Sequence, residues 1–160
     1  MTASSAAEKT TAEAQLRSLI EKFDPRDQKL IRSVRSAVRK RLPAANELLY
    51  DYGTFFVIGY SPTERPTDGI VAVAARPDGV RLYLMQGPRL PDPKKLLEGS
   101  GKQTRFIRVE TARHLAHPDV EALIAAAIER AAVPLPSAGR GRLVIRTDSS
   151  KRRPRPKPAT

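Results

Sequence analysis

The 160-residue sequence contains no cysteine and no tryptophan, and only 5% of its residues are aromatic. The absence of cysteine excludes disulfides, thiolate zinc sites and cysteine nucleophiles, and fits a reducing compartment. The longest apolar run, residues 122–128, is far shorter than the roughly 20 residues that a membrane-spanning helix needs. No apolar signal-peptide segment precedes it, because small, polar and charged residues dominate the start of the chain. We therefore expect a soluble cytoplasmic protein.

Negative charge is scarce in two parts of the chain, which has a net charge of +12. Residues 24–42 hold seven basic and two acidic side chains, and residues 137–160 hold eight basic side chains and one acidic. Residues 43–136, by contrast, contain eleven of each sign. The surplus positive charge therefore lies in one segment and one tail, which predicts an anionic partner.

Three helices are predicted from apolar residues at helical spacing. They span Ala12–Phe23, Pro25–Leu42 and Pro118–Ala132. Asp24 is the expected N-cap of the second helix, since Pro25 suits the first helical position. Residues 1–10 show no apolar periodicity, and we expect them to be disordered.

Strand signals lie between the second and third helices. Residues 48–60 read as two strands joined near Gly53, residues 70–75 and 80–85 as a hairpin, and residues 105–109 as a further strand. These elements predict an α+β fold of two layers, with a mainly antiparallel sheet covered on one face by helices.

The predicted domain spans residues 11–136. A basic, proline-rich tail follows at residues 137–160, in which residues 142–146 are apolar enough to add one short edge strand.

The glycine-rich stretch at residues 99–102 superficially resembles a phosphate-binding loop. Such a loop ends in Gly-Lys followed by Ser or Thr and opens a helix, whereas Gln103 follows Lys102 here. A short helix is instead predicted from Pro93 to Leu97, with Asp92 as its cap, so the stretch would follow a helix C-terminus, where partial negative charge disfavours phosphate. We do not expect a phosphate site there.

The sequence contains only weak candidates for a catalytic or metal site. His114 and His117 are the only histidines, and zinc usually requires three or four ligands of this kind. Glu47 and Asp51 form a conceivable acid–base pair, but carboxylates at this spacing are more often solvated or capping groups. No Gly-x-Ser-x-Gly elbow is present. We expect a protein that is not an enzyme and has no cofactor.

Three stretches carry a family resemblance: PAANELLY at residues 43–50, GPRLPDPKKLLEGSGK at 87–102 and RFIRV at 105–109. Together they resemble the YdhG-like family, the domain of unknown function numbered 1801, over residues 19–133. The resemblance implies a small frataxin-like α/β fold. It also implies, for part of the family, an iron-binding role of acidic residues on the first helices, which the basic segment 24–42 disfavours.

Within the resembling region, five side chains are candidates for a ligand-binding site on one exposed face of the sheet. They are Glu47, Tyr50, Tyr83, Lys102 and Arg105. One interpretation is a small pocket for an anion or a peptide. The other is an internal ion pair of Glu47 with Lys102 or Arg105 beside two packed tyrosines.

The basic helix and tail form a second candidate surface, for nonspecific nucleic-acid binding through phosphate contacts. Its residues are Arg32, Arg35, Arg39, Lys151, Arg152, Arg153, Arg155 and Lys157. The alternative is a tail that only keeps the protein soluble. We expect a non-enzymatic binding module for an anionic ligand or protein partner, with nucleic-acid association and iron binding as the alternatives.

Overall fold

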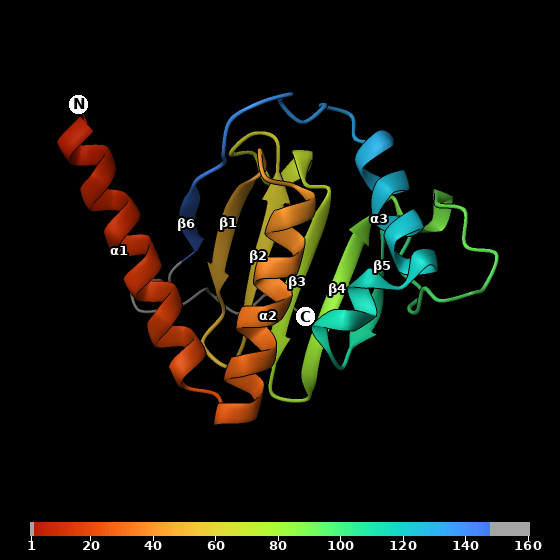
Figure 1. The fold of residues 1–160 in the computed structure, drawn as a ribbon, viewed down its shortest axis with the longest axis horizontal. Helices are drawn as coiled ribbons and strands as arrows, with labels where there is room; N and C mark the ends of the chain where they lie inside the picture. Colours follow the sequence, from red (N-terminus) through yellow and green to blue (C-terminus); the bar gives the residue numbers. More distant parts are fainter. Residues whose placement is uncertain (1, 148–160) are drawn as a thin grey trace, which may run out of the picture.

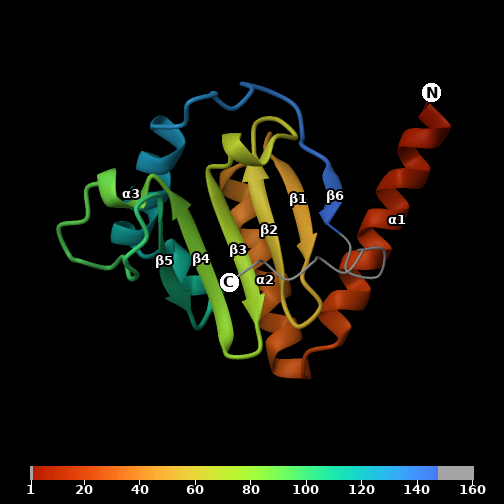
Figure 2. The same cartoon turned by 180° about the vertical axis from the view of Figure 1, so that it is seen from behind.

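The computed structural model describes residues 2–147, with side chains from residue 11 to residue 146. Helices α1 (Thr2–Glu21), α2 (Pro25–Arg41) and α3 (Pro118–Glu129) lie on one face of a six-stranded sheet (Figure 1). Seen from behind, the other face of the sheet carries no helix from the described part of the chain (Figure 2). The predicted two-layer α+β architecture is confirmed.

The sheet has the order β5-β4-β3-β2-β1-β6. Its strands are β1 (Asn46–Asp51), β2 (Phe56–Ser61), β3 (Val71–Arg76), β4 (Gly79–Met85), β5 (Thr104–Val109) and β6 (Leu143–Thr147). The strands β1 to β5 form an antiparallel meander, in agreement with the predicted mainly antiparallel sheet, and β6 pairs with β1 in parallel. Single turns of 3₁₀ helix occur at η1 (Pro66–Asp68), η2 (Gly87–Arg89) and η3 (Ala112–Ala116).

Helix α2 begins as its sequence predicts. The Asp24 carboxylate accepts a hydrogen bond from the Asp27 amide at 3.0 Å, and Pro25 occupies the first helical position. The buried face of the helix contains Ile31, Val34 and Val38, which pack on the sheet. The opposite side of α2 is therefore left to its basic side chains.

Helix α1 starts at Thr2, ten residues before the predicted Ala12, in a segment that we expected to be disordered. Alanine and other helix-compatible residues are frequent there, and intrinsic propensity extends the helix without an apolar face of its own. From Ala12 onward, Leu16, Leu19 and Ile20 are buried in the core. None of the helices in residues 2–147 is long and apolar enough to cross a membrane.

Strand β6 extends the folded body beyond residue 136, the predicted end of the domain. Arg142 donates its amide proton to the Asn46 side chain at 2.9 Å, and its carbonyl accepts from the Glu47 amide at 2.8 Å. Leu143 is buried against α1 and the sheet. The predicted short edge strand is thus confirmed, and it makes the chain up to Thr147 part of the sheet.

The segment before β5 differs from its prediction. Asp92 accepts hydrogen bonds from the amides of Leu96 and Leu97, at 2.8 and 2.9 Å, but the segment forms a turn and not a helix. Lys95 has φ of 55°, a left-handed conformation that ends helical propagation after one turn. The glycine-rich stretch then leads into strand β5, not into the helix N-terminus that a phosphate-binding loop requires.

Candidate anion-binding site

A buried carboxylate of strand β1 faces the helices and is contacted by a side chain of α2. Glu47 points toward the helices and is only 4% exposed. Its register neighbour on β2 is Tyr60, which is fully buried and donates its hydroxyl proton to Glu47 at 2.8 Å. Directly opposed residues on antiparallel strands share one face, so the hairpin register brings these two side chains together.

Arg35 of α2 supplies the charge that balances Glu47. Its guanidinium donates Nε and Nη2 protons to the two Glu47 oxygens at 2.9 and 2.8 Å. The same guanidinium binds both oxygens of Glu13 on α1, at 3.3 and 2.9 Å. Arg35 therefore joins α1, α2 and β1 through two bidentate contacts, the strongest geometry for this pair of groups.

These contacts shift two proton affinities. Burial opposes the charge of Arg35, but hydrogen bonds to Glu47 and Glu13 outweigh it and raise the pKa of Arg35 above its usual value. Burial, followed by the neighbouring Glu47 carboxylate, raises the pKa of Tyr60 well above its usual value. Arg35 thus stays charged and Tyr60 stays neutral, which keeps the network fixed.

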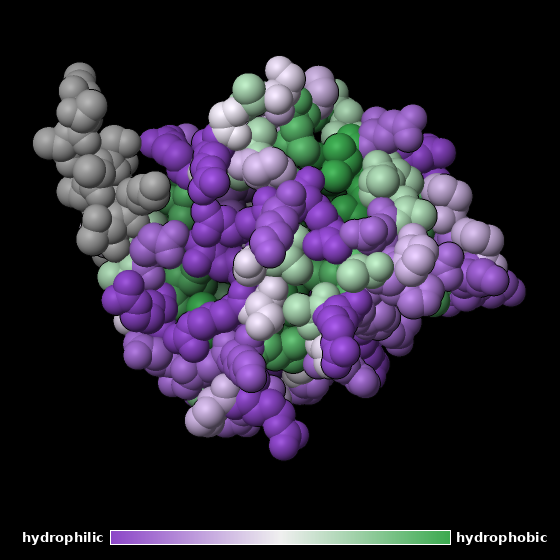
Figure 3. Space-filling model, viewed as in Figure 1, coloured by the Kyte–Doolittle hydropathy of each residue, from purple (hydrophilic) through white to green (hydrophobic). Residues whose placement is uncertain are grey.

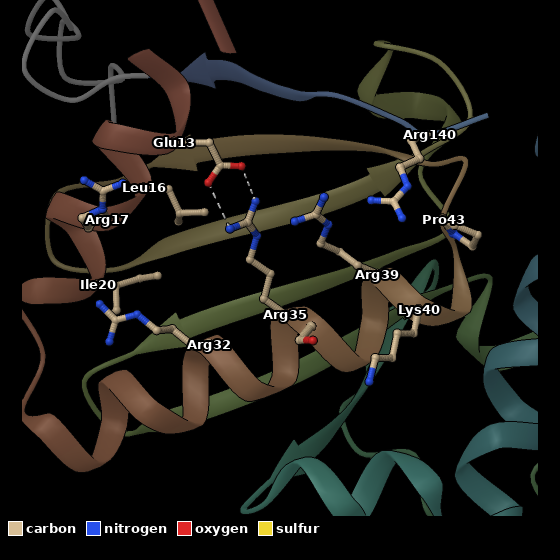
Figure 4. Close-up of a pocket in the computed structure, with 11 residues that line it drawn as sticks. Glu13, Leu16, Arg17, Ile20, Arg32, Arg35, Arg39, Lys40, Pro43 and Arg140 are labelled. Carbon is tan, nitrogen blue, oxygen red and sulfur yellow. Dashed lines mark hydrogen bonds and ion pairs between the residues drawn. The ribbon is translucent and has the colours of Figure 1, made fainter. Parts of the chain in front are cut away.

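Beside this network, a pocket of about 570 Å³ opens between α1 and α2 (Figure 4). Its lining comes from both helices and from the loop segments near β1 and β6: Glu13, Leu16, Arg17, Ile20, Arg32, Arg35, Ser36, Arg39, Lys40, Pro43 and Arg140. In Figure 4, Arg39 and Arg140 extend toward each other from opposite sides, while Glu13 and Arg35 meet between the helices. Hydrophilic side chains also dominate the surrounding helix-side surface in Figure 3. The pocket is therefore a charged hollow with a small aliphatic part.

The charge of the lining is strongly positive. It contains six arginine or lysine side chains and one carboxylate, Glu13, which is already bound to Arg35. Arg39 approaches Glu47 at 3.6 Å but remains 46% exposed. Within residues 11–146, no ion pair joins Arg17, Lys40 or Arg140 to a carboxylate. Several cations therefore surround the pocket without a matching set of carboxylates.

The five residues of the predicted sheet-face site do not converge. Glu47 faces the helices, whereas Tyr50 and Tyr83 lie on the opposite face of the sheet. Lys102 is exposed in a loop, and Arg105 donates its Nε proton to the Gly101 carbonyl at 2.8 Å.

Strand order explains the failure. Three strands separate β5 from β1, so residues of the Lys102–Arg105 region cannot reach Glu47. The expected ion pair of Glu47 with Lys102 or Arg105 is therefore wrong, although Glu47 is indeed in an internal ion pair. Its partner is Arg35.

The nucleic-acid candidates divide into two groups. Arg32, Arg35 and Arg39 all line the pocket, but Arg35 is occupied by Glu13 and Glu47. The five candidates at positions 151–157 lie outside the described residues: Lys151, Arg152, Arg153, Arg155 and Lys157.

Sequence reasoning missed several polar contributors to the network and its pocket, among them Glu13, Arg17, Lys40, Tyr60 and Arg140. Glu13 and Arg17 are four apart and follow the buried Ala12 and Leu16 by one position, which places them at the border of the apolar face of α1. That spacing is a signal that the sequence does contain. Arg140 has no such signal, since only the parallel pairing of β6 with β1 carries it to α2.

The two histidines have structural surroundings. His117 is the N-cap of α3, and its Nδ1 accepts the Asp119 amide proton at 3.2 Å. His114 lies in η3. In the part of the chain that the structure describes, no three His, Asp or Glu side chains gather in a way that could hold a metal ion.

Comparison with known proteins finds no matching family model, no matching curated protein and no matching solved structure.

Proposed function

We propose that this protein is a binding module whose pocket between α1 and α2 holds a small, multiply charged anion. The observation that carries the proposal is the excess of cations around the pocket, where the single lining carboxylate is already bound to Arg35. A concave site with charge of one sign concentrates the field and raises the local concentration of counter-ions. Phosphate and carboxylate groups are the anions whose geometry matches arginine forks.

The fixed network below the pocket supports this role. Arg35 is held by two carboxylates, so it does not compete for a ligand, and it locks α1 to α2 at one point. Arg39 and Arg140, which come from separate parts of the chain, then face the hollow from opposite sides (Figure 4). Arg39 also approaches Glu47 at 3.6 Å, and a cation that is partly held in place loses less conformational freedom on binding, which favours affinity.

The lining offers little for covalent chemistry. Apart from Ser36, its polar groups are guanidinium, ammonium and one paired carboxylate, none of which is arranged as a nucleophile with a base. We therefore propose binding without turnover.

The test is calorimetry of the full chain with inorganic pyrophosphate and, separately, with citrate. Arg39→Gln and Arg140→Gln should each weaken binding by about tenfold or more, because each removes a charge-assisted hydrogen bond worth about 1.5–3 kcal/mol. Arg89→Gln is the matched control, since Arg89 is exposed on η2 and lies outside the pocket lining. Equal losses in all three variants would refute a localised site, and the absence of heat with either anion would refute the pocket as an anion site.

Nonspecific nucleic-acid association is a second candidate, favoured by Arg32 and Arg39. They are seven residues apart on α2, and both are exposed. This candidate predicts affinity for duplex DNA that falls steeply with salt and disappears when residues 148–160, which follow strand β6, are deleted. Binding that is independent of salt would exclude it.

A frataxin-like iron role is the least supported candidate, because a pocket lined by arginine and lysine repels ferrous ion. Membership of the YdhG-like family stays a prediction.

A further inference from the structure

The face of the sheet away from the helices, which Figure 2 shows from the front, has a composition of its own in the strand registers. Its centre consists of small residues, Gly59 on β2 and Ala72 and Ala74 on β3. Larger rings flank this centre, Tyr50 from β1 on one side and Tyr83 with Phe106 from β4 and β5 on the other. The result is a row of small side chains between two aromatic borders, and because Ala72 and Ala74 are only 6% and 1% exposed, the accessible aromatic surface lies at the borders.

The aromatic rings lie close to the sheet. A Cβ atom placed on Gly59 would lie 3.6 Å from Cε2 of Tyr50, which shows that the Tyr50 ring leans over this glycine. Tyr83 and Phe106 contact each other with ring centroids 5.3 Å apart and planes tilted by 42°. All three rings are partly exposed. Arg81 covers part of the Tyr83–Phe106 pair, since its Cζ atom lies 4.7 Å from the Phe106 ring centroid and it donates an Nη1 proton to the Tyr83 hydroxyl at 3.4 Å. Each ring is thus held by its neighbours while part of its surface remains accessible.

Charge on this face has one sign along the strands. In the described strands, four arginines and no aspartate or glutamate point away from the helices. The arginines are Arg76, Arg81, Arg108 and Arg146. Two carboxylates outside the strands approach these arginines, Asp78 at 3.3 Å from Arg81 and 3.6 Å from Arg76, and Glu98 at 3.6 Å from Arg108. Both carboxylates are at least 47% exposed, so the face keeps a positive surplus.

We propose that this sheet face binds single-stranded nucleic acid, with bases stacked on Tyr50 and on the Tyr83–Phe106 pair. Base–aromatic stacking tolerates any sequence, and cations beside the rings attract the phosphates. Tyr50 and Tyr83 stand on strands three intervals apart, about 14 Å at about 4.8 Å per interval. Domains that bind RNA on an open four-stranded sheet stack two or three bases over such a width.

The position of Thr147, the last residue that the structure describes, favours this occupant. The described chain stops at Thr147, whose register partner is Tyr50, beside one aromatic border. The sequence continues with thirteen residues, of which five are lysine or arginine and one is acidic. A single strand stacked on Tyr50 would therefore lie next to the start of a strongly basic segment. A second copy of the chain fits less well, because a symmetric contact would place arginines against arginines.

The experiment is fluorescence anisotropy of a labelled twelve-nucleotide oligo(dT) and oligo(rU), with a duplex of equal length as competitor, on the full chain. Tyr50→Leu and Tyr83→Leu should each weaken binding by roughly tenfold, because each removes a stacking surface while an apolar side chain remains. Tyr83→Phe should bind like the wild type. The pocket variants Arg39→Gln and Arg140→Gln should retain binding, which separates this site from the proposed anion pocket.

A second readout is independent of these substitutions. The chain has four tyrosines and no tryptophan, so its intrinsic fluorescence reports on tyrosine, and oligonucleotide binding should quench it. No binding at low salt, unchanged affinity in folded Tyr50→Leu and Tyr83→Leu, or preference for the duplex would overturn the proposal. Sedimentation that shows a dimer broken by these two substitutions would overturn it as well, in favour of a second copy.

Discussion

The ion pair between Arg35 and Glu47 gives the most direct prediction on stability. We consider Glu47→Gln, which keeps the shape of the side chain and removes its charge. The side chains of Arg35 and Glu47 are only 14% and 5% exposed, so solvent screens their contact weakly. Removing one member of a buried pair usually costs about 3–5 kcal/mol. Because Arg35 retains Glu13, we expect the lower end, about 3 kcal/mol.

The assay is urea unfolding at neutral pH, followed by circular dichroism. In thermal unfolding, the same loss of about 3 kcal/mol corresponds to a fall in melting temperature of roughly 6–12 °C for a folded region of this size. A double-mutant cycle with Arg35→Met isolates the contact, and we expect a coupling free energy of at least about 1.5 kcal/mol. The slope against urea should not change, since both variants keep the same fold.

A matched surface pair provides the control. Glu64 contacts Arg142 at 2.7 Å, yet the two side chains are 46% and 52% exposed. Glu64→Gln should therefore cost less than about 1 kcal/mol. If Glu47→Gln cost no more than Glu64→Gln, or if the cycle were additive, the account of Arg35 as the buried link between α1, α2 and β1 would be refuted.

Three further predictions concern local features. Gly141→Ala should destabilise the protein by about 3 kcal/mol in urea unfolding, since the added Cβ would overlap the Ala45 carbonyl. Gly139→Ala meets no atom within 4 Å and should cost only about 1–2 kcal/mol, because Gly139 has a positive φ. Equal costs for the two variants would contradict the close approach of Gly141 to Ala45. Asp24→Ala should cost about 1 kcal/mol through loss of the α2 N-cap, and no loss in the same assay would contradict that role. Because the pKa of Tyr60 is raised in the folded protein, this tyrosine ionises at a lower pH in the unfolded chain. The stability that is present below about pH 10 should therefore fall by up to about 1.4 kcal/mol for each pH unit above pH 10. Urea midpoints from about pH 8 to pH 11 should show that Tyr60→Phe loses this fall; a parallel decline in both proteins would contradict it.

The elements of the fold follow from local chemistry that the sequence displays. Alternation along residues 80–85 sets which side of β4 is buried, and Asp24 with Pro25 sets where α2 begins. The turn after Asp92 did not follow, because Lys95 adopts a left-handed conformation that lysine rarely takes. The helical turns before Ala12 were also missed, since they rest on propensity without an apolar stripe.

The candidate site was predictable only in part. The basic character of α2 and the internal ion pair of Glu47 were both visible in the sequence. The identity of the pair was not, because it depends on strand order, which places β1 far from β5, and on the reach of the Arg35 side chain from α2 to Glu47. Arg140 is a further example, since its place at the pocket depends on the parallel pairing of β6 with β1.

The central claim, an anion pocket between α1 and α2, is tested most directly by NMR of the arginine side chains. Inorganic pyrophosphate is titrated into the full chain while the Nε–Hε signals are followed. We predict saturable shifts for Arg39 and Arg140, which face the pocket, and none for Arg89 on η2. Signals of Arg39 and Arg140 that stay fixed, or that shift no more than that of Arg89, would contradict the claim.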